Sequence, residues 1–162
     1  MIYKIPTLID KKAKTLDRTV FEQPKRGIEC MFIKLNKKQG VKIFPTESKA
    51  KFACKRQRKA YKYGIAPKVY SKVCKCLVDN LRKFDRDGFF IDESGNERMF
   101  GYCYITEVAH KGGRHTPKEI KRLEAVYDHL GFKSYDFHGG NLGRINGKLV
   151  AIDFGKESTT NW

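Results

Sequence analysis

Three side chains near the end of the sequence are of types that phosphoryl transfer uses. Asp136 lies five residues before Asn141, and Asp153 follows Asn141 by twelve residues. Carboxylate and amide oxygens ligate the magnesium ions that bridge nucleotide phosphates, and a further carboxylate can stand beside the acceptor hydroxyl. A tight loop can carry Asp136 and Asn141, and a hairpin can bring in Asp153. These residue types could therefore serve a site for a nucleotide and a metal ion.

The elements around these residues are readable from turn and cap signals. Residues 142–144 and 149–152 flank Asn146-Gly147, which is the strongest two-residue hairpin signal. Upstream, Thr116-Pro117-Lys118-Glu119 opens a helix with an N-cap, a proline in the first turn and a capping box, and Gly131 ends it. The expected buried stripe of this helix is Ile120, Leu123, Ala125, Val126, Tyr127 and Leu130.

The first two thirds of the chain predict four strands and one helix. The strands are expected at 29–35, 41–44, about 68–78 and about 99–108. The helix should run from residue 46 to about 63, with Thr46 or Ser48 as its cap. Its less polar face is Ala50, Ala53, Cys54, Gln57, Ala60 and Tyr61. Because an inward-facing amide needs partners, Gln57 is expected to meet a polar site.

The run Asp136-Phe137-His138-Gly139-Gly140-Asn141, followed by Ile152-Asp153-Phe154-Gly155, resembles two motifs of the protein-kinase-like superfamily. These are the catalytic loop and the metal-binding Asp-Phe-Gly. The resemblance implies an α+β, protein-kinase-like fold. Residues 1–109 would form an amino-terminal lobe with an antiparallel sheet and one helix. Residues 110–162 would form a truncated carboxy-terminal lobe with the catalytic loop and hairpin. His138 stands where aminoglycoside and choline kinase-like enzymes often have His, so the resemblance is closest to small-molecule and atypical kinases.

The resemblance also implies roles for the residues of the loop and hairpin. Asp136 would accept the proton of the attacking hydroxyl or orient that hydroxyl, and His138 would lie near the transferred group. Asn141 and Asp153 would hold Mg²⁺.

Further roles fall in the amino-terminal part. Lys42, in Val41-Lys42-Ile43-Phe44, resembles the strand lysine that holds the α and β phosphates of ATP. Gln57 occupies the position of the helix glutamate that pairs with this lysine. The backbone from Glu107 to Ala109 would face the adenine.

The sequence departs from the family pattern in several places. No Gly-x-Gly-x-x-Gly precedes the first expected strand, where only Gly27 lies nearby, and Ser134 stands where the family usually has His. Gln57 can hydrogen-bond Lys42 but cannot pair its charge, and Glu47 is an alternative partner that would require a shifted helix. The sequence ends seven residues after Gly155. We therefore expect the activation segment, the helical bulk of the second lobe and its peptide-docking groove to be missing.

Two functions follow as hypotheses. The first is a magnesium-dependent phosphotransferase that moves the γ-phosphate of ATP to a serine or threonine of a partner, to itself or to a small molecule. The alternative is a catalytically degenerate pseudokinase that acts as a basic binding or inhibitor protein. The chain has 162 residues and a net charge of +16, which favours an acidic protein or nucleic acid as partner. Basic residues with interleaved aromatics between Lys49 and Tyr63 could provide the surface, although such charge runs are usually solvated faces.

The cysteines and the apolar runs bear on the compartment. The five cysteines are Cys30, Cys54, Cys74, Cys76 and Cys103, with no Cys-x-x-Cys pair, which predicts reduced thiols in a cytosolic protein rather than a zinc site. On a strand, Cys74 and Cys76 would share a face. No apolar run approaches a signal peptide or a membrane span, so we expect a cytoplasmic protein without a membrane partner. The small size and lysine-rich composition suggest a viral protein, such as one from a bacteriophage, in a host cytoplasm.

Overall fold

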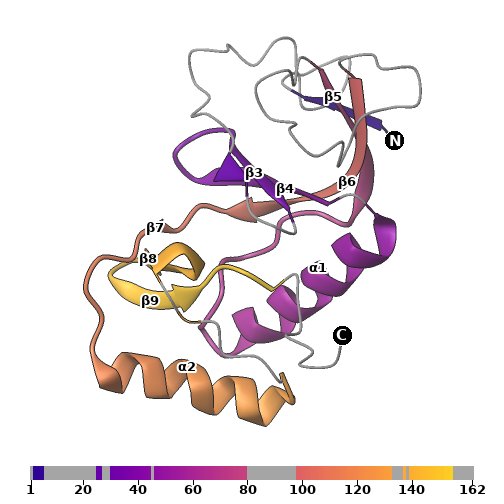
Figure 1. Cartoon of the computed structure of the whole chain (residues 1–162). Coiled ribbons are helices and arrows are strands. Elements are labelled where there is room, and N and C mark those ends of the chain that lie inside the picture. Colours follow the sequence, from indigo (N-terminus) through magenta and orange to yellow (C-terminus); the bar gives the residue numbers. More distant parts are fainter. Residues whose placement is uncertain are drawn as a thin grey trace.

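The larger of two sheets forms the upper half of the molecule in Figure 1. The computed structural model describes residues 2–5, 25–26, 30–44, 46–79, 98–132, 137 and 139–154. The strands of this sheet, in spatial order, are β1 (Ile2–Ile5), β5 (Cys74–Asp79), β6 (Arg98–Glu107), β4 (Gln39–Phe44), β3 (Met31–Lys34) and β2 (Lys25–Arg26). All neighbours pair antiparallel except β1 and β5, which are parallel. The predicted α+β class is confirmed.

The second sheet has three strands and carries the predicted hairpin. They are β7 (His110–Lys111), β8 (Leu142–Ile145) and β9 (Lys148–Ala151), and a short 3₁₀ turn, η2 (Gly139–Asn141), leads into β8. Asn146 and Gly147 have φ angles of 50° and 78°, so both turn residues adopt the left-handed conformation that tight hairpins require. The hairpin prediction is confirmed, whereas β7 was not predicted because two residues carry no periodic signal.

Helix α1 (Glu47–Lys62) begins and ends as its cap residues indicate. The Thr46 hydroxyl accepts a hydrogen bond from the Lys49 N–H, and Gly64 follows the helix with φ of 72°. Of the predicted face, Ala50, Ala53, Cys54, Gln57 and Ala60 are buried.

Two residues of α1 differ from the prediction. Tyr61 is 43% exposed, because its position lies about 100° around the helix from Ala60. Arg56 is buried, and its guanidinium carbon lies 4.0 Å from the ring centroid of Phe132 and 5.0 Å from that of Phe52. A planar guanidinium can stack on aromatic faces, which is how this cation enters the interior.

Helix α2 (Pro117–Leu130) has the predicted capping box and a left-handed Gly131 at its end. Leu123 and Tyr127 are buried, and Ile120, Val126 and Leu130 are half-buried. Ala125 is exposed, so its place in the buried stripe is wrong. Two residues after Leu123 the helix has turned by about 200°, which points this position away from the core.

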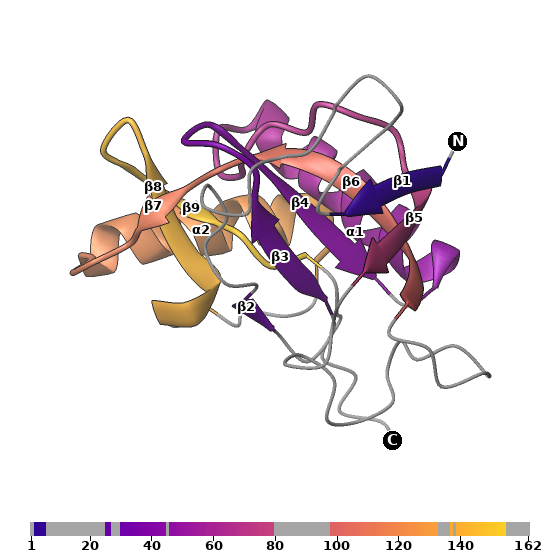
Figure 2. The same ribbon diagram turned by 90° about the horizontal axis from the view of Figure 1, so that it is seen from above.

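Two hydrophobic clusters join the elements. One lies between α1 and the large sheet and includes Phe44, Ala53 and Tyr104. The other joins the end of α1, α2 and the β8–β9 hairpin, and it includes Leu123, Tyr127, Phe132, Leu149 and Phe154. Figure 2 shows α1 and α2 on the far side of the strands. The Ala151 N–H donates to the Ile65 carbonyl at 2.9 Å, which fixes the hairpin against the segment after α1.

The remaining strand predictions need smaller corrections. The strand expected from residue 68 begins only at Cys74; before it, Val69 makes an isolated bridge with Thr106. Strand β1 was not predicted, since its pairing with β5 is a long-range contact. The five cysteines are free thiols, and Cys74 Sγ lies 3.8 Å from Cys103 Sγ.

None of the helices in the described ranges is long and apolar enough to cross a membrane.

Candidate functional site

Lys42 lies at the centre of the candidate site, on the inner strand β4 between β3 and β6. Its side chain is only 7% exposed. The Lys42 Nζ donates to the Gln57 Oε1 of α1 at 3.1 Å and also to the Ile152 carbonyl just before Asp153. One ammonium group therefore joins a strand, a helix and the Asp-Phe-Gly segment.

The Gln57 amide is fully buried and has partners on both of its polar atoms. Its Oε1 accepts from Lys42 Nζ and from the Tyr104 hydroxyl at 2.9 Å. Its Nε2 donates to the Pro67 carbonyl at 2.9 Å and to Thr106 Oγ1 at 2.6 Å. An ammonium group can only donate and a carbonyl can only accept, so these neighbours fix the orientation of the amide. They also explain why a glutamine stands here, because a carboxylate has no hydrogen to donate to Pro67.

Burial lowers the pKa of Lys42, because a charged ammonium loses hydration inside the protein. Negative charge on the Cys30 thiolate, the Asp153 carboxylate or the Cys54 thiolate would act in the opposite direction and favour the charged form. The Asp153 carboxylate is thus close enough to Lys42 to influence it electrostatically. The Phe154 ring, 3% exposed, lies 5.8 Å from Lys42 Nζ.

The backbone of Asn141 meets Ile152, the residue before Asp153, where the β8–β9 hairpin opens. Leu142 pairs with Ala151, and one step further the Ile152 N–H donates to the Asn141 carbonyl at 3.0 Å. Asn141 is half-buried and Asp153 is exposed. The hairpin thus places the two predicted metal ligands at the same end, next to the Lys42 contact with Ile152.

The donor set at this end of the hairpin fits Mg²⁺. One amide and one carboxylate are hard oxygen donors, and Mg²⁺ characteristically takes one or two protein ligands together with phosphate oxygens and water. Among the residues that the structure describes, no group of three or more His, Cys, Asp and Glu side chains could hold a metal ion. The other two predicted catalytic residues, Asp136 and His138, lie outside the described residues, as do Ser134 and Gly155.

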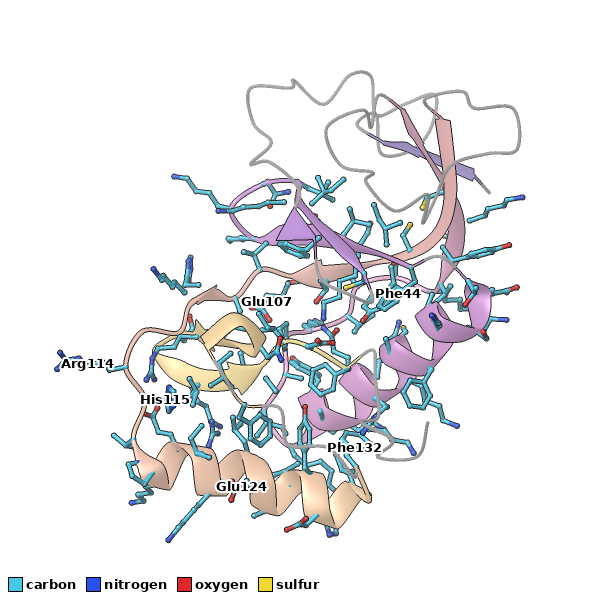
Figure 3. All side chains as sticks on the ribbon, in the orientation of Figure 1. Phe44, Glu107, Arg114, His115, Glu124 and Phe132 are labelled. Carbon is cyan, nitrogen blue, oxygen red and sulfur yellow. The ribbon has the colours of Figure 1, made fainter. Side chains whose placement is uncertain are left out.

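The backbone expected to face adenine lies at the end of β6. The Glu107 N–H donates to the Lys68 carbonyl at 2.8 Å, and the Val108 N–H donates to the Lys38 carbonyl at 2.9 Å. Figure 3 shows Glu107 between the larger sheet and the β8–β9 hairpin. Ala109 packs so closely on β8 that a Cβ added at Gly143 would lie 2.6 Å from the Ala109 Cβ. The backbone N–H groups of Glu107 and Val108 thus already donate to carbonyls of the protein itself.

The alternative in which Glu47 pairs with Lys42 is wrong. Glu47 Oε1 lies 2.7 Å from Lys51 Nζ in an exposed ion pair one turn along α1. Lys42 meets Gln57 in the unshifted helix.

Sequence reasoning missed two residues of the buried network, Tyr104 and Thr106. Both point inward from β6, and Tyr104 is the register partner of Lys42. Burial raises the pKa of Tyr104 well above its ordinary value, so the hydroxyl remains a donor to Gln57. The alternation of a buried strand next to Lys42 is the signal that could have indicated them.

No protein-family model matches this sequence, and a search of curated proteins finds no match either.

Proposed function

We propose that this protein is a magnesium-dependent, kinase-like phosphotransferase that moves the γ-phosphate of ATP to a hydroxyl acceptor. The contact of Lys42 with both Gln57 and Ile152 supports this proposal most. The contact with Ile152 joins residues 110 positions apart in the sequence, and it sets the Lys42 ammonium next to the residue that precedes Asp153. A lysine with no role at this point would be expected to extend into solvent, because burial of its charge is costly.

The described side chains would act by position and charge. Lys42 would neutralise phosphate oxygens, and Gln57 would hold its ammonium in place from one side. Because the site is partly shielded from water, the attraction between Lys42 and phosphate would be stronger than at an exposed surface. Bound Mg²⁺ would neutralise further phosphate charge, and Asn141 and Asp153 would hold it.

Asp136 and His138 would complete the reaction on the acceptor side. Asp136 would orient the acceptor hydroxyl and take its proton as the oxygen attacks the γ-phosphorus, while ADP leaves. The acceptor class is a serine or threonine of a partner, the protein itself or a small molecule.

Calorimetric titration with ATP tests the nucleotide and metal site directly. We expect native protein to bind ATP with an affinity that depends on Mg²⁺. Asp153→Asn should weaken that affinity at least about tenfold, because loss of even an outer-shell partner of a metal ligand costs about 10- to 100-fold. Asp128→Asn is the matched control, because it makes the same chemical change at an exposed position of α2. Absence of binding to native protein at millimolar ATP, or equal binding by Asp153→Asn, would refute the proposed site.

Phosphate transfer is tested separately with radiolabelled ATP and with protein, peptide and small-molecule acceptors. Asp136→Ala should abolish transfer and leave ATP binding nearly intact, since the family role of this residue concerns the acceptor. Transfer by this variant at the native rate would remove Asp136 from the mechanism.

One observation favours the alternative, a pseudokinase. The helix partner of Lys42 is a neutral amide whose neighbours exclude a carboxylate. The charge pairing that the kinase resemblance implies is thus replaced by a hydrogen bond. Magnesium-dependent ATP binding without transfer to any acceptor would support this alternative.

A further inference from the structure

The outward side of α1 carries a row of cations that the candidate nucleotide site does not use. Lys51, Lys55, Lys59 and Lys62 follow one another at spacings of four, four and three residues, and all four are exposed. With a rise of about 1.5 Å per residue, the row is about 16 Å long. It lies on the opposite side of the helix from Ala53 and Ala60, which face the core.

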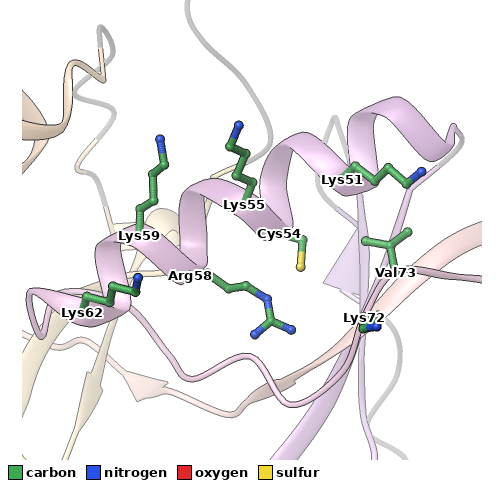
Figure 4. A pocket seen from close by; sticks show the side chains of 8 residues that line it. All are labelled: Lys51, Cys54, Lys55, Arg58, Lys59, Lys62, Lys72 and Val73. Carbon is green, nitrogen blue, oxygen red and sulfur yellow. The ribbon is translucent and has the colours of Figure 1, made fainter.

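This row forms one wall of a groove. The groove has a volume of about 630 Å³, and Figure 4 shows the side chains that line it. Cys54 and Arg58 of α1 also line it, and Lys72 and Val73 come from the segment that leads into β5. Arg58 Nη2 donates to the Ser71 carbonyl at 2.8 Å, which ties the two walls together. The charged residues that line it in the described part of the chain are all cations.

Among the described residues, acids neutralise little of this positive charge. Within the described ranges, the ion pair that reaches the row is Lys51–Glu47, and both of its side chains are more than half exposed. Exposed ion pairs of this kind are weak, because water and salt screen the attraction between the two charges. A groove lined by one sign of charge raises the local concentration of an oppositely charged partner, so its ligand should be a polyanion.

Two exposed tyrosines beside the groove indicate whether its polyanion is an acidic peptide or a nucleic acid. Tyr61 on α1 is 43% exposed, and Tyr70, two residues before Lys72, is 42% exposed. The hydrogen bond from Arg58 to the Ser71 carbonyl places Tyr70, the residue before Ser71, close to the turn of α1 that carries Arg58 and Tyr61. An acidic peptide would need only the cations. Nucleobases, by contrast, stack on exposed aromatic rings, and such stacking stabilises single strands on proteins.

We infer that this groove binds single-stranded nucleic acid, with phosphates along the lysine row and bases on Tyr61 and Tyr70. The inference is independent of the proposed phosphotransfer, because Lys42 and Gln57 lie on the buried side of α1. Either function can therefore fail without the other.

Fluorescence anisotropy with labelled 15-nucleotide oligo(U) and oligo(dT) tests the groove over a series of salt concentrations. For single strands, the logarithm of affinity falls with the logarithm of salt by about 0.7 for each phosphate neutralised. The triple variant Lys55→Gln, Lys59→Gln, Lys62→Gln should therefore flatten this slope by about 2. Its control is Lys111→Gln, Lys118→Gln, Lys121→Gln, which removes the same charge from exposed positions outside the groove and should leave the slope nearly unchanged.

A second variant separates nucleic acid from other polyanions. Tyr61→Ser with Tyr70→Ser should lower affinity about tenfold or more and leave the salt slope unchanged. Tyr63→Ser, at a tyrosine that is 47% exposed and bonded to His129, is the control. Circular dichroism would verify that each variant is folded. The inference is overturned if native protein binds neither oligonucleotide at low salt. It is overturned equally if polyglutamate binds as tightly as the oligonucleotides, or if the tyrosine variant binds them like native protein.

Discussion

Replacing Gln57 with glutamate restores the residue type of the kinase pattern, and we expect Gln57→Glu to destabilise this protein. The Nε2 group of Gln57 donates to the Pro67 carbonyl at 2.9 Å, and the residue is fully buried. An ionised carboxylate would place an acceptor against this carbonyl and leave it without a donor. Its contact with Lys42 would become an ion pair instead of a hydrogen bond from the ammonium to a neutral amide.

The expected magnitude follows from these contacts. Loss of the donor to a buried carbonyl costs about 1–3 kcal/mol. Desolvation of the new carboxylate roughly offsets its attraction to Lys42, because buried ion pairs commonly break even. Thr106 Oγ1 now donates to the Lys68 carbonyl, so a turn of its hydroxyl toward the carboxylate would exchange one hydrogen bond for another. We therefore expect the free energy of unfolding to fall by about 2 kcal/mol, which corresponds to a Tm decrease of about 4–8 °C for a chain of this size.

Urea denaturation followed by circular dichroism measures this difference. Gln39→Glu is the matched control, because it makes the same change at the half-exposed start of β4 on a chain of net charge +16. Its new carboxylate would lie opposite Glu107 on β6, which itself lowers stability and makes the comparison with Gln57→Glu a stringent one. The deficit should shrink in acid, since a protonated carboxyl can again donate to Pro67. Gln57→Glu with a stability equal to or above that of Gln39→Glu would refute the assigned orientation of the amide.

Two further predictions concern packing and pH. Gly101→Ala should destabilise the fold by about 1–3 kcal/mol, because the added Cβ would lie 2.8 Å from the buried Ile43 Cγ2 and 3.0 Å from the Phe44 carbonyl. Gly139→Ala, where nothing lies within 4 Å, is its control in the same urea assay, and equal stabilities would contradict the close packing. The Arg144 guanidinium and the Thr116 N–H lower the pKa of Glu119 to about 2 from an ordinary value of 4.5. A depressed carboxyl pKa stabilises the fold above the unfolded-state value and loses that contribution as pH falls between 4.5 and about 2, so Glu119→Gln should be less stable than native protein at neutral pH and match it near the lower limit. Glu124→Gln on the same helix is the control, and a Glu119→Gln deficit that stays constant with pH would argue against the ion pair.

The sequence alone predicted the features that depend on neighbouring residues. Thr116 and Glu119 mark the start of α2, Asn146-Gly147 marks the hairpin turn, and Gly131 marks a helix end, because caps and turns involve only a few consecutive residues. The same local reasoning set Gln57 on the inward face of α1.

What each inward side chain touches was decided by the tertiary structure. Pro67, Tyr104 and Thr106 reach Gln57 from separate segments, so only the assembled core shows that an amide, and not a carboxylate, satisfies all of them. Arg56 illustrates the same point, since a cation on a basic helix becomes buried only once Phe132 is there to stack on it.

The two candidate sites show the same difference between features set by neighbouring residues and features set by long-range contacts. The spacing of Asn141 and Asp153 is a local property, and the hairpin turn between them suffices to place both at the open end of the β8–β9 hairpin. The joining of that hairpin to Lys42, and the groove between α1 and the segment before β5, depend on contacts between distant parts of the chain. Such contacts form only when several elements occupy their places at once, and no periodicity within one element encodes them.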